Sequence, residues 1–103
     1  MIKVSVLYPA GTDTAFDMKY YCETHMPLVQ RFCGEACKGY TVDRGLGGGA
    51  PGSQAPYVAA GHLLFETVET FQASFGPNTA AIMADIPNYT KIAPVVQISE
   101  IMT

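Results

Sequence analysis

The segment Phe16–Pro27, FDMKYYCETHMP, places three aromatic residues, a cysteine, a histidine and a proline in one short stretch. Its aromatic residues recur at i, i+4 and i+5, which is the spacing of one helical face. His25 extends the Tyr21 side by one turn, and Pro27 follows where a helix must end or kink. An apolar helical face that ends in a titratable side chain suits either a small pocket or an ordinary buried helix.

The sequence on either side of this helix predicts four strands and a second helical region. Residues 2–8, IKVSVLY, are rich in β-branched residues and predict the first strand. The first helix is expected in two pieces, one ending near Thr24 and one running from Pro27 towards Cys33. The further expected elements are strands over 40–46, 57–65 and 94–102 and a helical region over 66–86 that is broken at Gly76 and Pro77.

The order strand, helix, strand, strand, helix, strand is typical of the α+β ferredoxin-like βαββαβ fold, in which both helices cover one face of an antiparallel sheet. The length of 103 residues predicts a single domain, 1–103. The third strand, YVAAGHLLF, is apolar on both faces, so both faces need a cover. A second copy that faces the open side of the sheet would complete a dimeric α+β barrel.

Composition supports a homodimer and excludes several kinds of partner. Hydrophobic residues make up 49% of the chain and charged residues 15%, more apolar than so small a monomer can bury. The net charge is −3 and the six Lys and Arg are scattered, so neither nucleic acid nor a membrane surface is an expected partner. Three cysteines without an export signal or a membrane-length apolar run predict free thiols and a cytoplasmic protein.

Several blocks along the chain have a familiar order. LYP after the first strand, FDMKYY followed by THMP, a glycine-rich loop, and DIPNYT with PVVQISEI near the end resemble the EthD family over essentially the whole length. The resemblance implies a dimeric α+β barrel. It also implies links to catabolic oxygenase operons, with an oxygenase as a candidate partner, and to lactone isomerisation, cyclisation or decarboxylation.

His25 and Tyr40 are the expected catalytic residues. The pKa of an ordinary histidine is about 6.5, so His25 can give or take a proton near neutral pH. By resemblance, both residues match site-lining positions in lactone-isomerising relatives, where a phenol such as Tyr40 can stabilise a developing oxyanion. The alternatives are a core histidine bonded to a backbone carbonyl and a tyrosine packed at the sheet edge.

His62 and Tyr8 are the expected substrate-binding residues. His62 lies in the third strand, where it either faces the barrel cavity or makes a hydrogen bond at a subunit interface. Tyr8 belongs to the LYP block that follows the first strand. Some isomerising relatives carry a cysteine one position beyond His62, where this chain has Leu63, so an identical lactone isomerisation is not expected.

No metal, haem or other cofactor is expected. The pairs Cys22/His25 and Cys33/Cys37 have helical spacing, but neither has an obvious complement for a four-ligand site. The run GLGGGAPG lacks the Lys-Ser or Lys-Thr ending of a phosphate loop and precedes a strand. We interpret residues 45–55 as a mobile loop and a candidate lid. The order of residues also gives no Ser-His-Asp triad or nucleophile elbow.

The sequence therefore predicts cofactor-free proton transfer, of isomerase, cyclase or decarboxylase type, on a small hydrophobic carbonyl, lactone or aromatic compound in the barrel cavity. His25 would be the general acid or base, and Tyr40 would stabilise the oxyanion. Tyr20, Tyr21 and Cys22 are expected to be mainly core residues. The alternative is a non-catalytic accessory or ligand-binding protein of a catabolic oxygenase pathway.

Overall fold

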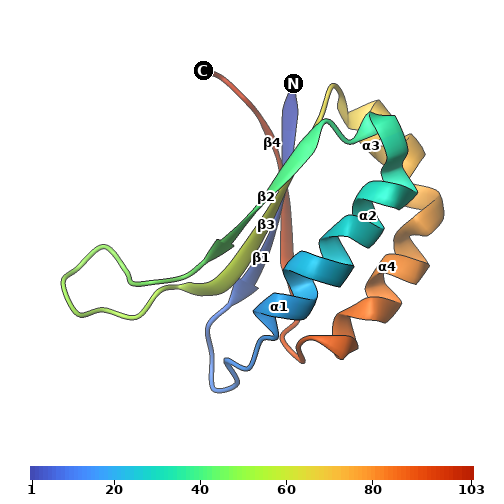
Figure 1. Cartoon of the computed structure of the whole chain (residues 1–103). Coiled ribbons are helices and arrows are strands. Elements are labelled where there is room, and N and C mark those ends of the chain that lie inside the picture. The colour runs from blue at the N-terminus through green and yellow to red at the C-terminus, as the bar shows by residue number, and fades with distance from the viewer.

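A computed structural model describes residues 1–103 and contains one four-stranded antiparallel sheet with helices on one face (Figure 1). The strands lie side by side in the order β2-β3-β1-β4. This arrangement confirms the predicted ferredoxin-like βαββαβ fold. The strands are β1 (Ile2–Pro9), β2 (Gly39–Arg44), β3 (Tyr57–Phe65) and β4 (Val95–Glu100), and the helices are α1 (Met18–Tyr20), α2 (Met26–Cys33), α3 (Val68–Phe75) and α4 (Thr79–Asp85).

The register of the strands divides the sheet into a helix-covered face and an open face. Val4 of β1 lies opposite Leu63 of β3 and Ile98 of β4, and Ser5 lies opposite His62. Directly opposed residues share a face. Val4 and Leu63 belong to the buried core with the helices, so Ser5 and His62 project from the open face.

The first helix is continuous, which corrects the predicted division into two pieces. Between α1 and α2, residues Tyr21–His25 form a π-helical segment, and the N–H of Met26 donates to the carbonyl of Tyr21. Pro27 has no N–H to donate, and this wider turn lets the chain pass the proline without ending the helix. The same turn stacks the ring of Tyr21 on that of His25, with centroids 5.5 Å apart.

The second helical region breaks at Gly76 and Pro77, where the sequence predicted a break. Thr67 caps α3 through reciprocal hydrogen bonds with Thr70, and a 3₁₀ turn over Gly76–Asn78 separates α3 from α4. A further 3₁₀ turn, Ile86–Asn88, follows α4. After it, the carbonyl of Tyr89 accepts a hydrogen bond from the N–H of Asp17, 2.8 Å away. The two helical regions are therefore joined at one end, beside the start of the first helix.

Smaller differences concern element ends and exposure. The last strand is shorter than predicted, and β2 ends at Arg44, after which the chain forms a long arm that projects away from the helices (Figure 1). The role of this arm as a lid stays a prediction. Tyr21 is buried as expected, whereas Tyr20 is only half-buried and Cys22 is exposed, which corrects their assignment to the core.

Candidate active site

An apolar cavity of about 180 Å³ lies between the helix-covered face of the sheet and the helices. Its lining is hydrophobic at 13 of 16 residues, and the lining residues that carry polar side-chain atoms are Tyr8, Tyr21, His25 and Thr79. An engineered apolar cavity of about 150 Å³ holds one benzene molecule. The cavity of this chain therefore accommodates a compound of about one six-membered ring.

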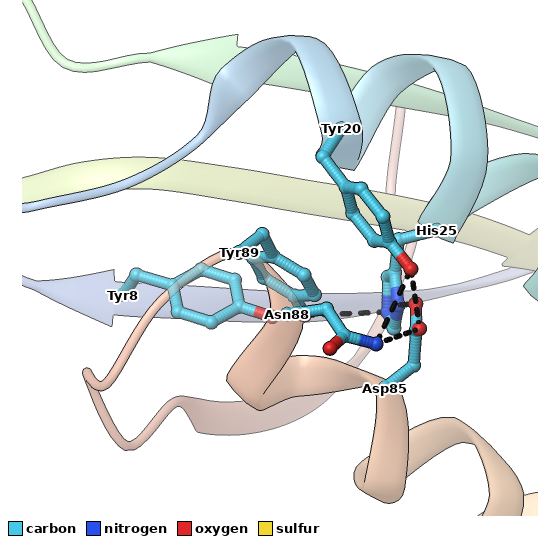
Figure 2. Close-up of polar contacts among 6 residues, drawn as sticks. All are labelled: Tyr8, Tyr20, His25, Asp85, Asn88 and Tyr89. Atoms are coloured by element: carbon cyan, nitrogen blue, oxygen red, sulfur yellow. Dashed lines mark hydrogen bonds and ion pairs between the residues drawn. The ribbon is translucent and has the colours of Figure 1, made fainter.

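His25 is held at this cavity by hydrogen bonds to both ring nitrogens. Its side chain lies between Asp85 and Tyr89 (Figure 2), with Nδ1 2.8 Å from Asp85 Oδ2 and Nε2 3.3 Å from the Tyr89 hydroxyl. An ionised carboxylate can only accept, so Nδ1–H donates to Asp85 and Nε2 of the neutral ring is left as an acceptor. The residue is 4% exposed. This tautomer is the one that a base acting through Nε2 requires.

Asp85, at the end of α4, is fixed by donors from two elements. Its Oδ1 accepts from the Tyr20 hydroxyl at 2.7 Å and from Asn88 Nδ2 at 2.9 Å, while Oδ2 accepts from His25 (Figure 2). Desolvation raises the pKa of this carboxyl, but the hydrogen bonds from Tyr20, His25 and Asn88 outweigh it and lower the pKa below its ordinary value. Asp85 is therefore a carboxylate at neutral pH.

Burial sets the protonation of the groups around the cavity. Desolvation lowers the pKa of His25, and it outweighs the hydrogen bond and charge of Asp85, which act in the opposite direction. Desolvation also raises the pKa of Tyr8 and of Tyr89. At neutral pH the imidazole is thus uncharged and available as a base, and both hydroxyls keep their protons.

Tyr89 joins His25 to Tyr8. The hydroxyls of Tyr8 and Tyr89 are 2.6 Å apart, and Tyr89 is only 4% exposed. The ring centroids of Tyr89 and His25 are 4.7 Å apart, and those of Tyr89 and Tyr21 are 5.0 Å apart. Packing among these aromatic rings therefore holds the hydroxyls of Tyr8 and Tyr89 in fixed positions.

Two of the four predicted site residues meet at the cavity and two do not. His25 and Tyr8 both line it, whereas Tyr40 and His62 line a separate hollow with Lys3 and neighbouring residues. The apolar cavity lies between the sheet and the helices, whereas the sequence placed the ligand beyond the open face, in the interior of the predicted barrel.

His62 makes its hydrogen bonds on the open face. Its Nδ1 is 2.8 Å from Ser5 Oγ and its Nε2 is 3.0 Å from Asp43 Oδ2. Strand pairing thus brings together a serine, a histidine and an aspartate that are far apart in the chain. The Asp43 side chain is 61% exposed in the single chain, so no other part of this chain covers the pair. Within one chain this arrangement is a hydrogen-bond network on the open face.

The residues that complete the candidate site were not identified from the sequence. Asp85, Asn88 and Tyr89 lie in the block DIPNYT, which carried the family resemblance but was not interpreted as a site. Their i, i+3, i+4 spacing was the available signal, because it places three polar side chains along one side of a helical turn. Tyr20 was assigned to the core, although its hydroxyl bonds Asp85.

The structure has neither a cluster of metal-binding side chains nor a helix that could cross a membrane. No group of three or more His, Cys, Asp or Glu side chains lies close enough together to hold a metal ion. None of the helices combines the length and the apolar character needed to cross a membrane.

Comparisons with known proteins agree on one family. The family model described as the EthD domain matches residues 9–92. An EthD-like protein from Ralstonia eutropha JMP134 is 45% identical with a TM-score of 0.94, covering 99% of this chain and 92% of that one. An EthD family protein from Bacillus halodurans C-125 is 20% identical, with a TM-score of 0.72 and 99% coverage of both chains.

A more distant structural match is similar in fold alone. A candidate antibiotic biosynthesis monooxygenase from Bordetella bronchiseptica is 15% identical, with a TM-score of 0.61, over 99% of this chain and 96% of that one. No curated protein matches this sequence.

Proposed function

Because this chain belongs to the EthD domain family, we propose that it binds a small apolar carbonyl, lactone or aromatic compound in the cavity between helices and sheet and transfers protons on it without a cofactor. The observation that carries the proposal is the hydrogen-bonded pair of His25 and Asp85 beside an otherwise apolar cavity. A perturbed titratable group in a cleft of this kind is a candidate for acid–base chemistry.

Each group in the site would have a distinct part in the reaction. Asp85 keeps His25 in the tautomer with Nδ1 protonated and stabilises the imidazolium that forms when Nε2 takes a proton. The apolar walls exclude water, which strengthens every electrostatic interaction with the developing charge. Tyr8 supplies a neutral hydroxyl on the same lining. This set of groups suits removal of a proton from carbon next to a carbonyl group.

The second candidate function is a ligand-binding or accessory protein without chemistry, for example one that holds an intermediate for a partner oxygenase. One observation favours it: both nitrogens of His25 already have protein partners, and the residue is 4% exposed. Under this proposal the cavity still binds a compound of about one ring, but no proton is transferred.

Exchange of carbon-bound hydrogen for deuterium separates the two candidates. Cyclohexanone and cyclohex-2-enone are incubated with the protein in heavy water, and loss of the α-proton signals is followed by NMR. Proton transfer predicts exchange above the buffer rate that falls by about 100-fold or more in His25→Ala. Binding of the ketones without exchange would favour the accessory protein instead.

His62→Ala is the matched comparison, since it removes the only other imidazole in the chain. His62 lies on the opposite face of the sheet from the cavity, so its removal is expected to leave exchange within about threefold of wild type. Loss of exchange in His62→Ala but not in His25→Ala would place the chemistry on the open face and contradict the proposal.

A further inference from the structure

Tyr89 contacts both of the polar groups that the proposed chemistry uses, but it is not itself among the residues that line the cavity. Its hydroxyl is 2.6 Å from that of Tyr8 and 3.3 Å from Nε2 of His25. His25 and Tyr8 both line the cavity. The two cavity groups are therefore joined behind the lining by one buried hydroxyl (Figure 2).

We propose that Tyr8, Tyr89 and His25 form a proton relay that moves a proton from the α-carbon to the carbonyl oxygen of a monocyclic ketone held in the cavity. This inference rests on the proposed function and adds a second catalytic residue, Tyr8, and a relay residue, Tyr89. The net reaction is the tautomerisation of a ketone to its enol.

The hydrogen bonds of the chain admit two directions because each hydroxyl has one proton. In one direction Tyr89 donates to Nε2 of His25, and Tyr8 donates to Tyr89. In the other direction Tyr89 donates to Tyr8, which frees the lone pair on Nε2 and turns the proton of Tyr8 to the ligand. The shorter distance, 2.6 Å, belongs to the Tyr8–Tyr89 pair. A carbonyl oxygen in the cavity would favour the second direction, because it accepts the proton of Tyr8.

The step balances without an added reactant. The α-C–H bond breaks and an Nε2–H bond forms on His25, which leaves an enolate whose oxygen accepts from Tyr8. The Nε2 proton then passes to Tyr89, the Tyr89 proton to Tyr8, and the Tyr8 proton to the enolate oxygen. His25 returns to its neutral form and both tyrosines keep one proton each. No oxidation or reduction takes place.

The cavity narrows the class of substrate. Its volume of about 180 Å³ suits one six-membered ring with small substituents, and its largely hydrophobic lining includes no carboxylate, lysine or arginine side chain. A compound with one carbonyl group and an otherwise apolar ring pairs its oxygen with Tyr8 and buries the rest of its surface. Charged or multiply hydroxylated rings would leave polar groups unpaired, which costs free energy.

Tyr89 also lies near the protein surface, although its hydroxyl is buried. Besides touching His25, it lines an open hollow on the surface with residues that include Asp17 and Lys91. Deuterium that exchanges onto the Tyr89 hydroxyl would pass to the cavity through the relay. Exchange of α-protons is accordingly a direct readout of the relay.

The test compares cyclohexanone exchange in wild type, Tyr8→Phe, Tyr89→Phe and the double variant. Each single variant is expected to lower the rate by about 100-fold, the size of effect of one oxyanion donor. The double variant should be no slower than the slower single variant, because both substitutions interrupt the same chain. Tyr57→Phe makes the same chemical change at an exposed tyrosine of β3 and is expected to keep the wild-type rate.

Nitrogen NMR of histidine-labelled protein provides a readout that a packing role would not give, since the chain contains two histidines. In Tyr89→Phe the Nδ1 of His25 should stay protonated against Asp85, while the resonance of Nε2 shifts because it loses its donor. If His25 instead changes tautomer, Tyr89 is a packing residue and the relay is wrong.

The outcomes separate the relay from the proposed function. A Tyr89→Phe variant that exchanges at the wild-type rate, with His25→Ala inactive, overturns the relay and leaves the proposed function standing. Additive losses in the double variant also overturn the relay. Equal rates in wild type and His25→Ala would instead contradict the proposed function.

Discussion

Gly61 of β3 is a position where adding one methyl group should disturb the candidate site. A Cβ built at this residue overlaps the hydroxyl of Tyr21 and lies 3.3 Å from Tyr21 Cζ and 3.4 Å from Met26 Cε. Tyr21 is 1% exposed and its ring is packed against Tyr8, with centroids 5.7 Å apart. Because the buried ring has free space only on the side of the cavity that it lines, Gly61→Ala must shift Tyr21 or the strand.

The magnitude follows from two opposing effects. Alanine in place of a glycine inside a strand stabilises by roughly 0.5–1 kcal/mol through the unfolded chain. Overpacking of a filled core costs about 1–3 kcal/mol. We expect Gly61→Ala to lower the free energy of unfolding by about 1–2 kcal/mol and to narrow the cavity that Tyr21 lines.

A double-mutant cycle with Tyr21→Phe tests the cause. Removing the hydroxyl removes the overlapping atom, so Gly61→Ala should be close to neutral in the Tyr21→Phe background, a coupling energy of about 1–2 kcal/mol. The assay is urea unfolding at one fixed protein concentration. Gly76→Ala is the control, because a Cβ there meets nothing within 4 Å. Equal destabilisation by Gly61→Ala in both backgrounds would refute the reasoning.

Three further predictions concern the charged pair, pH and the open face. Asp85→Asn should lower ketone exchange by at least about 100-fold, because an amide no longer holds His25 in the required tautomer. Circular dichroism should show an intact fold. Unchanged exchange would show that Asp85 has no part in the chemistry. The pKa of His25 is lowered from 6.5, so the unfolded chain binds more protons, and thermal stability should fall as pH decreases from about 7 through 6.5 towards the folded pKa. The pKa of Asp85 is lowered from 3.8, so a further loss of thermal stability should follow below about pH 4. A His25→Gln variant should lack the loss of stability between about pH 7 and the folded pKa of His25, but should still unfold in acid. Leu7 shares the open face with Ala60 and Val95. Because a second copy is expected to cover this face, Leu7→Glu should convert a dimer to a monomer in sedimentation velocity at micromolar concentration. A wild-type monomer would contradict the expected homodimer.

The order of elements and the apolar third strand predicted the fold because they are local properties of the chain. The β-branched residues of 2–8, the run YVAAGHLLF and the Gly76–Pro77 break each depend on neighbouring residues alone, and the structure has a strand or a break at each of them. The helix at Pro27 was predicted less well, since local rules favour an end there and a π-helical turn carried the chain past it.

The candidate site was predicted only in part, for the same physical reason. His25 and Tyr8 were identified one at a time by their chemistry, and Tyr40 and His62 were chosen on equal grounds, although they lie away from the cavity. The sequence by itself determined the types of group and the elements that carry them. Only the tertiary structure decided that Asp85 and Tyr89, some sixty residues from His25, bond its two nitrogens. Contacts of that range depend on how helices pack on a sheet, and no spacing along the chain encodes them.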